Sequence, residues 1–100
     1  MLHTVNKSPF EKNSLRTCLR LAKPGSDILL IQDAVYAALS DTEWTNTIMD
    51  ALNMHRVYVL EPDWMARGLN PDRLIEGVKT VGYDGFVELA ARNDSVQSWL

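Results

Sequence analysis

The stretch Asp27-Ile28-Leu29-Leu30-Ile31-Gln32 decides the fold class, because it holds four consecutive aliphatic residues between two polar ones. An aliphatic run without alternation is typical of a strand that is covered on both faces, as the strands of a parallel sheet are. Four further segments are predicted as strands from apolar alternation or from β-branched and aromatic content. They are residues 2–5, 56–60, 78–81 and 95–100.

Helical segments lie between these strands. Ser8, Pro9 and Glu11 predict the start of a first helix, since Ser8 can cap it, Pro9 suits its first position and Glu11 completes a capping box. Pro24-Gly25 ends this helix. Further helices are predicted at residues 34–39, after a cap at Asp41 or Thr42, at residues 62–67, and after a cap at Asp84. Strands that alternate with helices form βαβ units, so the sequence predicts an α/β fold with a parallel sheet and helices on both faces. No linker or repeat interrupts the pattern, and we expect residues 1–100 to form a single domain.

The composition excludes several classes of protein. The 100 residues carry 10 Lys and Arg against 13 Asp and Glu, and the net charge of −3 argues against a nucleic-acid backbone binder. No apolar run approaches the roughly 20 residues of a membrane span, and residues 1–4 do not read as a signal peptide. The single cysteine, Cys18, excludes an internal disulfide and suits a reducing compartment. We therefore expect a cytoplasmic protein that contacts neither nucleic acid nor a membrane directly.

No motif for a cofactor stands out. The turn at residues 6–9, after the first predicted strand, contains no glycine and does not form a phosphate-binding loop. His3 and His55 have no Cys or His partner at metal-ligand spacing. We expect neither a cofactor nor a metal ion. A nucleotide-binding or regulatory α/β module stays open as an alternative function.

Cys18 is the candidate catalytic residue, because a thiolate can accept sulfane sulfur as a persulfide and pass it to a second thiolate. Its place between Leu21 and Ala22 on the apolar arc of the first helix favours the opposite interpretation, a buried and inert thiol. The same helix has a basic arc that either faces solvent or attracts an acidic partner. It consists of Arg16, Arg20 and Lys23.

The aromatic residues indicate a binding partner. Three tryptophans, three tyrosines and two phenylalanines are many bulky groups for a thin layered domain of this size. Aromatic residues are enriched at protein interfaces. Trp64, which follows Pro62-Asp63 at a helix start that we expect to be exposed, is the best interface candidate. Trp44 and Phe10 are further candidates.

Several segments together carry a family resemblance. They are LHTVNKSPF at residues 2–10, LLIQDAVYAA at 29–38, VYVL at 57–60 with Asp63, ARG at 66–68, Tyr83 with FV at 86–87, and VQSWL at 96–100. In this order they resemble the TusB/DsrH family of sulfur-relay subunits, over essentially the whole chain.

The resemblance implies a three-layer α/β/α domain with a mostly parallel five-stranded sheet. It also implies a subunit of a cytoplasmic heterohexamer that relays persulfide sulfur, with DsrE/TusD-like and DsrF/TusC-like partner subunits and a DsrC/TusE-like sulfur carrier. One branch of the family serves 2-thiolation of the wobble uridine of tRNA, and the other serves sulfur oxidation.

The comparison with the family pattern turns on its cysteines and on one turn. In the DsrE/TusD-type subunit the main sulfur-carrying cysteine lies just ahead of a helix that ends in Arg-Gly. The matching residues 60–68 contain no cysteine, so the resemblance implies that this chain is not the principal carrier. Cys18 matches a cysteine on the first helix of the DsrH branch, which favours that branch and makes Cys18 a candidate auxiliary persulfide site. Ala34 stands where relatives often have glycine, at a turn that would then need a positive φ.

Overall fold

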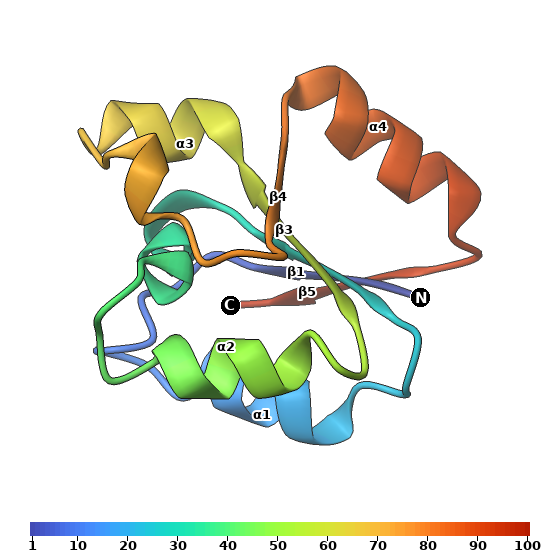
Figure 1. Ribbon diagram of the computed structural model, residues 1–100. Coiled ribbons are helices and arrows are strands. Elements are labelled where there is room, and N and C mark those ends of the chain that lie inside the picture. The colour runs from blue at the N-terminus through green and yellow to red at the C-terminus, as the bar shows by residue number, and fades with distance from the viewer.

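A five-stranded sheet forms the centre of the computed structural model, which describes residues 1–100 (Figure 1). Its strands are β1 (Leu2–Val5), β2 (Asp27–Leu30), β3 (Arg56–Leu60), β4 (Lys79–Val81) and β5 (Val96–Trp99). Their order across the sheet is β4-β3-β2-β1-β5, and every neighbouring pair is parallel. The predicted α/β fold is therefore confirmed, and the sheet is parallel throughout.

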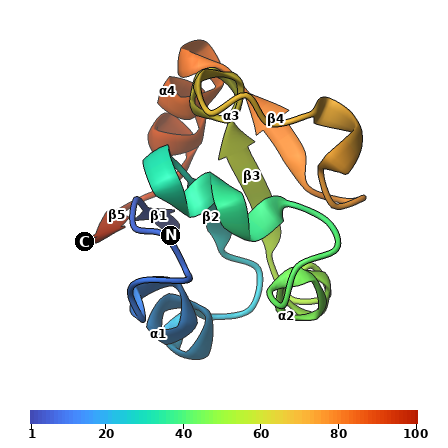
Figure 2. The same cartoon turned by 90° about the vertical axis from the view of Figure 1, so that its left-hand side faces the viewer.

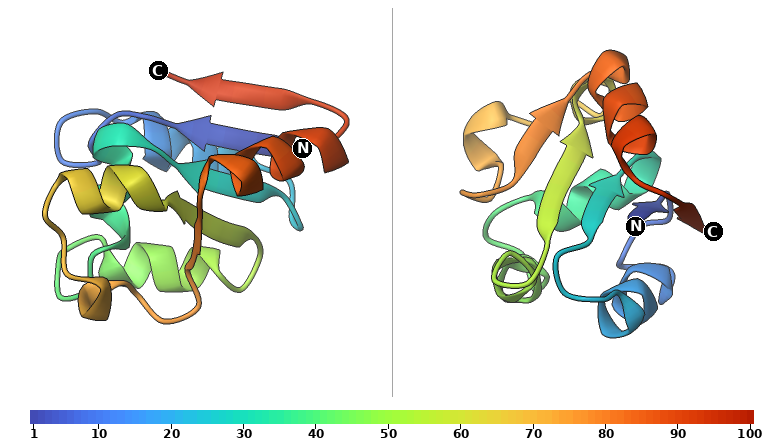
Figure 3. Two further views of the ribbon diagram at one scale, coloured as in Figure 1. Left: turned by 90° about the horizontal axis from the view of Figure 1, so that it is seen from above. Right: turned by 90° about the vertical axis from the view of Figure 1, so that its right-hand side faces the viewer.

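The helices cover the sheet on both faces and close one of its ends. They are α1 (Ser14–Leu21), the 3-10 helix η1 (Gln32–Ala38), α2 (Thr45–Ala51), α3 (Glu61–Ala66), the 3-10 turn η2 (Pro71–Arg73) and α4 (Tyr83–Arg92). In Figures 1 and 2, α1 and α2 lie on one face and α4 lies on the other. α3 and η1 lie together at the carboxyl-terminal end of the strands. Because α4 connects β4 at one edge to β5 at the other, it crosses the sheet (Figure 3).

Alternation along the strands divides the core into two parts. The larger part lies between the sheet and helices α1 and α2, where Ile28 and Val57 meet Leu15 and Ile48. The smaller part lies under α4 and holds four buried side chains, those of Leu2, Leu29, Tyr58 and Leu89. Successive strand residues point to opposite faces, so the unbroken aliphatic run of β2 supplies both parts. None of the helices combines the length and apolar character needed to cross a bilayer.

The first helix begins later than predicted. α1 starts at Ser14, and Ser8 instead closes a turn in which its carbonyl accepts hydrogen bonds from the N–H groups of Glu11 and Lys12. The prediction was wrong because a helix from residue 8 would have little to bury. Phe10 is half exposed, and the first helical side chain that reaches the core is Leu15. Burial of an apolar face, more than capping, determines where such a short helix begins.

Two other expectations about helix starts are corrected. The segment predicted as a helix from residue 34 is a 3-10 helix that already begins at Gln32. Gln32, with φ of 50°, is the residue in the left-handed region at this turn, and Ala34 is not. α4 begins at Tyr83 after Gly82, so Asp84 lies in the first helical turn instead of capping it. There its negative charge still favours the positive end of the helix dipole.

Candidate functional site

The carboxyl-terminal end of the sheet is where open parallel α/β folds bind ligands. Here the backbone N–H of Gln32 donates to Oδ2 of Asp63 at 2.7 Å, and this bond ties the turn after β2 to α3. Arg67 follows α3, and its Nη2 lies 2.9 Å from Oδ1 of Asp33. Its Nη1 donates to the carbonyl of Asp63 at 3.1 Å. This end of the sheet is thus closed by contacts between η1 and α3.

The closed end holds no group for sulfur transfer. Residues 60–68 bring two carboxylates, from Glu61 and Asp63, and one guanidinium, from Arg67, but no thiol. Of the carboxylates at this end, Asp63 and Asp33 both have partners in the chain. The two cavities of the molecule lie elsewhere, one at the amino-terminal edge of the sheet and one between α1 and α2. The contacts at the carboxyl end position α3 against η1.

Cys18 lies in the core. Its side chain is 0% exposed and packs in the larger core cluster beneath the sheet. Burial raises the pKa of the Cys18 thiol to about 12, so the thiol is protonated at neutral pH. The basic arc does not change this, because the Arg16 guanidinium stacks over the ring of Trp44, 4.8 Å from its centroid. The structure brings Cys18 to neither cavity, and the reachable thiolate that a sulfur carrier requires is absent from this arrangement.

The expected exposure of Trp64 is wrong. Trp64 is 2% exposed and Trp44 is similarly buried, and both belong to the larger core cluster. α3 covers the carboxyl end of the sheet, so Trp64, the fourth residue of this helix, points inward even though the helix itself lies on the surface. The indole N–H of Trp64 has no hydrogen-bond partner in the chain. Of the three interface candidates, Phe10 alone is at the surface, where 49% of it is exposed.

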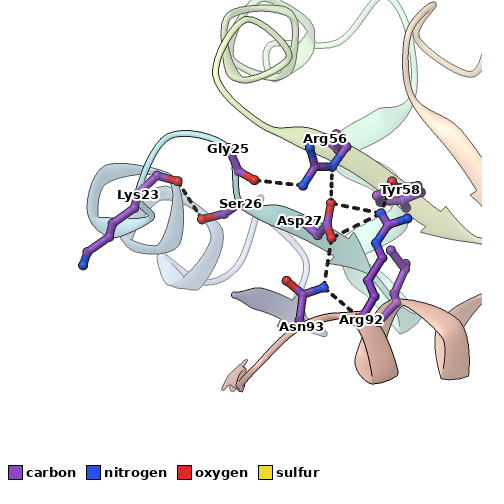
Figure 4. A network of polar contacts seen from close by, with 9 residues as sticks. Lys23, Gly25, Ser26, Asp27, Arg56, Tyr58, Arg92 and Asn93 are labelled. Carbon is purple, nitrogen blue, oxygen red and sulfur yellow. Dashed lines mark hydrogen bonds and ion pairs between the residues drawn. The ribbon is translucent and has the colours of Figure 1, made fainter.

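A network around Asp27 was not predicted from the sequence. The Asp27 side chain is 1% exposed, and its Oδ1 accepts a hydrogen bond from Nε of Arg56 at 2.5 Å (Figure 4). Its Oδ2 accepts from Nδ2 of Asn93 at 2.9 Å and lies 3.3 Å from Nη2 of Arg92. The same Nη2 donates to the hydroxyl of Tyr58 at 3.0 Å. One buried carboxylate therefore joins the start of β2, the start of β3 and the end of α4.

The charge of Asp27 is stabilised by these donors. Burial alone would raise the pKa of the carboxyl. Hydrogen bonds from Asn93 and Arg56, with the positive charges of Arg56 and Arg92, outweigh burial and hold the pKa of Asp27 below its ordinary value. A sequence signal for half of this network exists. Asp27 and Arg56 each come directly before the apolar part of a buried strand, and the parallel register pairs them.

Comparison with known proteins identifies the family. The family model for DsrH like protein matches residues 7–96. The TusB protein of Erwinia tasmaniensis is 40% identical over 100 residues, which cover 99% of this chain and 100% of that protein. The TusB protein of Yersinia pestis strain Pestoides F is 37% identical over 99 residues, with the same coverage.

Solved structures show the same fold. The ychN protein of Escherichia coli superimposes with a TM-score of 0.81 at 23% identity, over 97% of both chains. The MTH1491 protein of Methanobacterium thermoautotrophicum superimposes with a TM-score of 0.70 at 16% identity, over 97% of this chain and 95% of that one. These likenesses concern the fold, while the family match and the TusB relatives extend over nearly the whole sequence. The chain belongs to the TusB/DsrH family.

Proposed function

We propose that this chain is an architectural, partner-binding subunit of a cytoplasmic sulfur-relay complex. The observation that carries the proposal is the 40% identity to a TusB protein over 99% of the chain. The family resemblance supplies the rest of the assignment, a heterohexamer with two copies each of this chain, a DsrE/TusD-like subunit and a DsrF/TusC-like subunit. In this assignment the partner subunits carry the sulfur, and this chain supplies a surface to which they bind.

The chemistry of a relay supports the architectural role. In each step a thiolate attacks the outer sulfur of a donor persulfide, the S–S bond to the donor breaks, and the donor leaves as a thiolate. The attacking thiol must be ionised and accessible. Cys18 has a pKa of about 12 and no exposed surface, and residues 60–68 offer no replacement. Cys18 as an auxiliary persulfide site would require α1 to open.

Exposed apolar side chains favour partner binding. Tyr83 and Val87 lie one turn apart on α4 and are 63% and 67% exposed, so the outward side of this helix presents apolar surface. Met65 on α3 and Phe10 in the turn after β1 are exposed as well. Apolar groups gathered on a helix that faces away from its own core are typical of interaction surfaces.

Co-expression with the two related chains tests the assembly. Light scattering after gel filtration should show one complex with two copies of each chain. Val87→Glu should weaken this complex without lowering the melting temperature of the chain alone, because Val87 is exposed and its removal leaves the core intact. The control is Glu88→Gln, at the next position of the same helix and also exposed. A chain that stays monomeric and ignores both partners would contradict the assignment.

Sulfur loading tests the division of roles. The complex is incubated with thiosulfate labelled at its sulfane sulfur and the sulfur-loading proteins of its source, and each subunit is analysed by mass spectrometry. We expect a persulfide on the DsrE/TusD-like subunit and none on this chain. Cys18→Ser should leave transfer to the DsrC/TusE-like carrier unchanged. Transfer that is lost in Cys18→Ser, with the complex still assembled, would instead make Cys18 a carrier. The final acceptor of the sulfur then separates the tRNA branch from the sulfur-oxidation branch.

A further inference from the structure

The larger cavity lies at the amino-terminal edge of the sheet, where β1, β2 and β5 begin. Its volume is about 470 Å³, within the range of roughly 300–1,000 Å³ that small-molecule sites occupy. Polar and apolar groups contribute about equally to its wall, and Met1, Leu21 and Pro24 supply the apolar part. No step of the proposed relay uses this cavity, which lies at the opposite end of the strands from α3 and η1.

His3 supplies a fixed hydrogen-bond donor to this cavity. The residue is only 5% exposed, it lines the cavity, and its Nδ1 accepts a hydrogen bond from Nε1 of Trp99 at 3.0 Å. A neutral imidazole that accepts at Nδ1 carries its proton on Nε2. Burial, the charge of the N-terminal amine and that of His55 lower the pKa of His3, so the neutral form predominates at pH 7. Nε2 has no acceptor in the chain, and it is not one of the fully buried polar atoms that lack a partner, so this donor keeps some accessible surface.

The charges around this edge favour an anion. Lys23 lines the cavity, and Nη2 of Arg56 donates to the carbonyl of Gly25, another lining residue, at 2.9 Å. Asp27 is neutralised by its own network, and Asp94 is the one carboxylate among the lining side chains. Three cationic side chains, Lys23, Arg56 and Arg92, therefore meet two carboxylates, Asp27 and Asp94, at this edge of a chain whose net charge is −3.

We propose that this cavity binds a small organic anion, whose carboxylate accepts a hydrogen bond from Nε2 of His3 and pairs with Lys23. The apolar side at Leu21 and Pro24 contacts the carbon skeleton of the ligand. A preformed polar donor with one tautomer gives such a site its orientation, because the donor does not have to rearrange on binding. The proposal is independent of the sulfur-relay assignment, since it uses neither Cys18 nor the outward side of α4.

Two histidines make a direct measurement possible. The chain contains only His3 and His55, so protein labelled with ¹⁵N-histidine gives one signal set from the cavity and one from outside it. The full chain, with its partner subunits where it purifies with them, is titrated with succinate and, separately, with inorganic phosphate, both at constant ionic strength. Succinate should shift the Nε2 signal of His3 in a saturable way and leave His55 unchanged. A shift that does not saturate, or saturation by phosphate at the same concentration, would overturn the proposal.

Matched variants separate the site from general electrostatics. His3→Asn keeps an acceptor near the Nδ1 position for Trp99 but removes Nε2, and calorimetry should then show succinate affinity about tenfold lower. Lys23→Met should weaken binding similarly, whereas Lys12→Met, which removes the same charge outside the cavity, should not. Melting curves establish that each variant is folded. Equal losses in Lys23→Met and Lys12→Met, or undiminished affinity in folded His3→Asn, would show that the cavity does not hold the anion.

Discussion

Replacement of Asp27 by asparagine should destabilise the fold, because the carboxylate is buried within a network of donors. The carboxylate is 1% exposed and accepts hydrogen bonds from Arg56, Asn93 and Arg92. A hydrogen bond to a charged group contributes about 1.5–3 kcal/mol, and burial of the charge costs several kcal/mol in return. The variant recovers the desolvation cost but places an amide N–H₂ among donors, so we expect a net loss of about 3 kcal/mol. For a chain of this size, that lowers the melting temperature by roughly 10–20 °C.

Urea unfolding measures this loss. The midpoint should fall while the slope of the free energy against urea stays constant, because the surface exposed on unfolding is the same. Glu43→Gln, at an exposed carboxylate, is the control and should stay within about 0.5 kcal/mol of the unmodified chain. The cycle with Arg56→Gln should show coupling, since Arg56 donates directly to Asp27. Asp27→Asn with an unchanged midpoint would refute the argument that this buried charge contributes net stability.

The acid side of the stability profile gives a second measurement of the same charge. The pKa of Asp27 is lowered in the folded chain, so its contribution is present above the pKa of the unfolded carboxyl, near 3.8, and is lost as the pH falls through the lower folded value. Asp27→Asn should therefore flatten the acid limb of the profile. Unchanged acid sensitivity in this variant would assign the acid limb to other groups.

Three further predictions concern the two histidines, Cys18 and two aromatic residues. Burial chiefly lowers the pKa of both His3 and His55. Because the unfolded chain therefore binds protons first as the pH falls, the contribution of the two neutral histidines to stability is fully present above pH 6.5 and decreases below it. Melting temperatures measured from pH 8 to pH 5 check this. Cys18 should react slowly with iodoacetamide in the native chain and fast in urea, and fast alkylation of the native chain would contradict its burial. Cys18→Ser should lower the free energy of unfolding by about 1–3 kcal/mol unless the hydroxyl bonds a carbonyl one turn back. Trp64→Ala should cost about 3–5 kcal/mol of folding stability, whereas Phe10→Ala should weaken assembly and leave unfolding unchanged; the reverse pattern would restore Trp64 as the interface anchor.

The sequence predicts the sheet well because its signal there is local. The aliphatic run of β2 and the β-branched content of β3 each lie within one element, and the order of strands and helices then fixes parallel connections. The burial of Cys18 was likewise predicted by one interpretation of the apolar arc of α1, since that arc is a property of the helix alone. These features can be predicted without knowing which segments of the chain pack together.

The parts that were missed depend on distant segments. Trp64 follows a proline at a helix start, a local pattern that fits exposed and buried positions equally, and only the place of α3 over the end of the sheet decides between them. The donors Arg92, the last residue of α4, and Asn93, which follows it, lie far along the chain from Asp27, and their approach depends on how α4 crosses the sheet. The cavity at the amino-terminal edge is likewise formed by three segments that lie apart in the sequence.

In this chain the carboxyl end of the sheet is closed and the larger cavity lies at the amino-terminal end, the reverse of the usual arrangement in parallel α/β folds. At the carboxyl end, where parallel folds place their ligands, the N–H of Gln32 bonds Asp63, Trp64 fills the space beneath α3, and no thiol is present. At the amino-terminal end, the chain has an open cavity lined by Lys23 and by His3, whose Nε2 has no acceptor in the chain. The contacts that close the carboxyl end hold α3 against η1. The site proposed at His3 and Lys23 therefore lies at the opposite end of the strands from residues 60–68, which contain no cysteine.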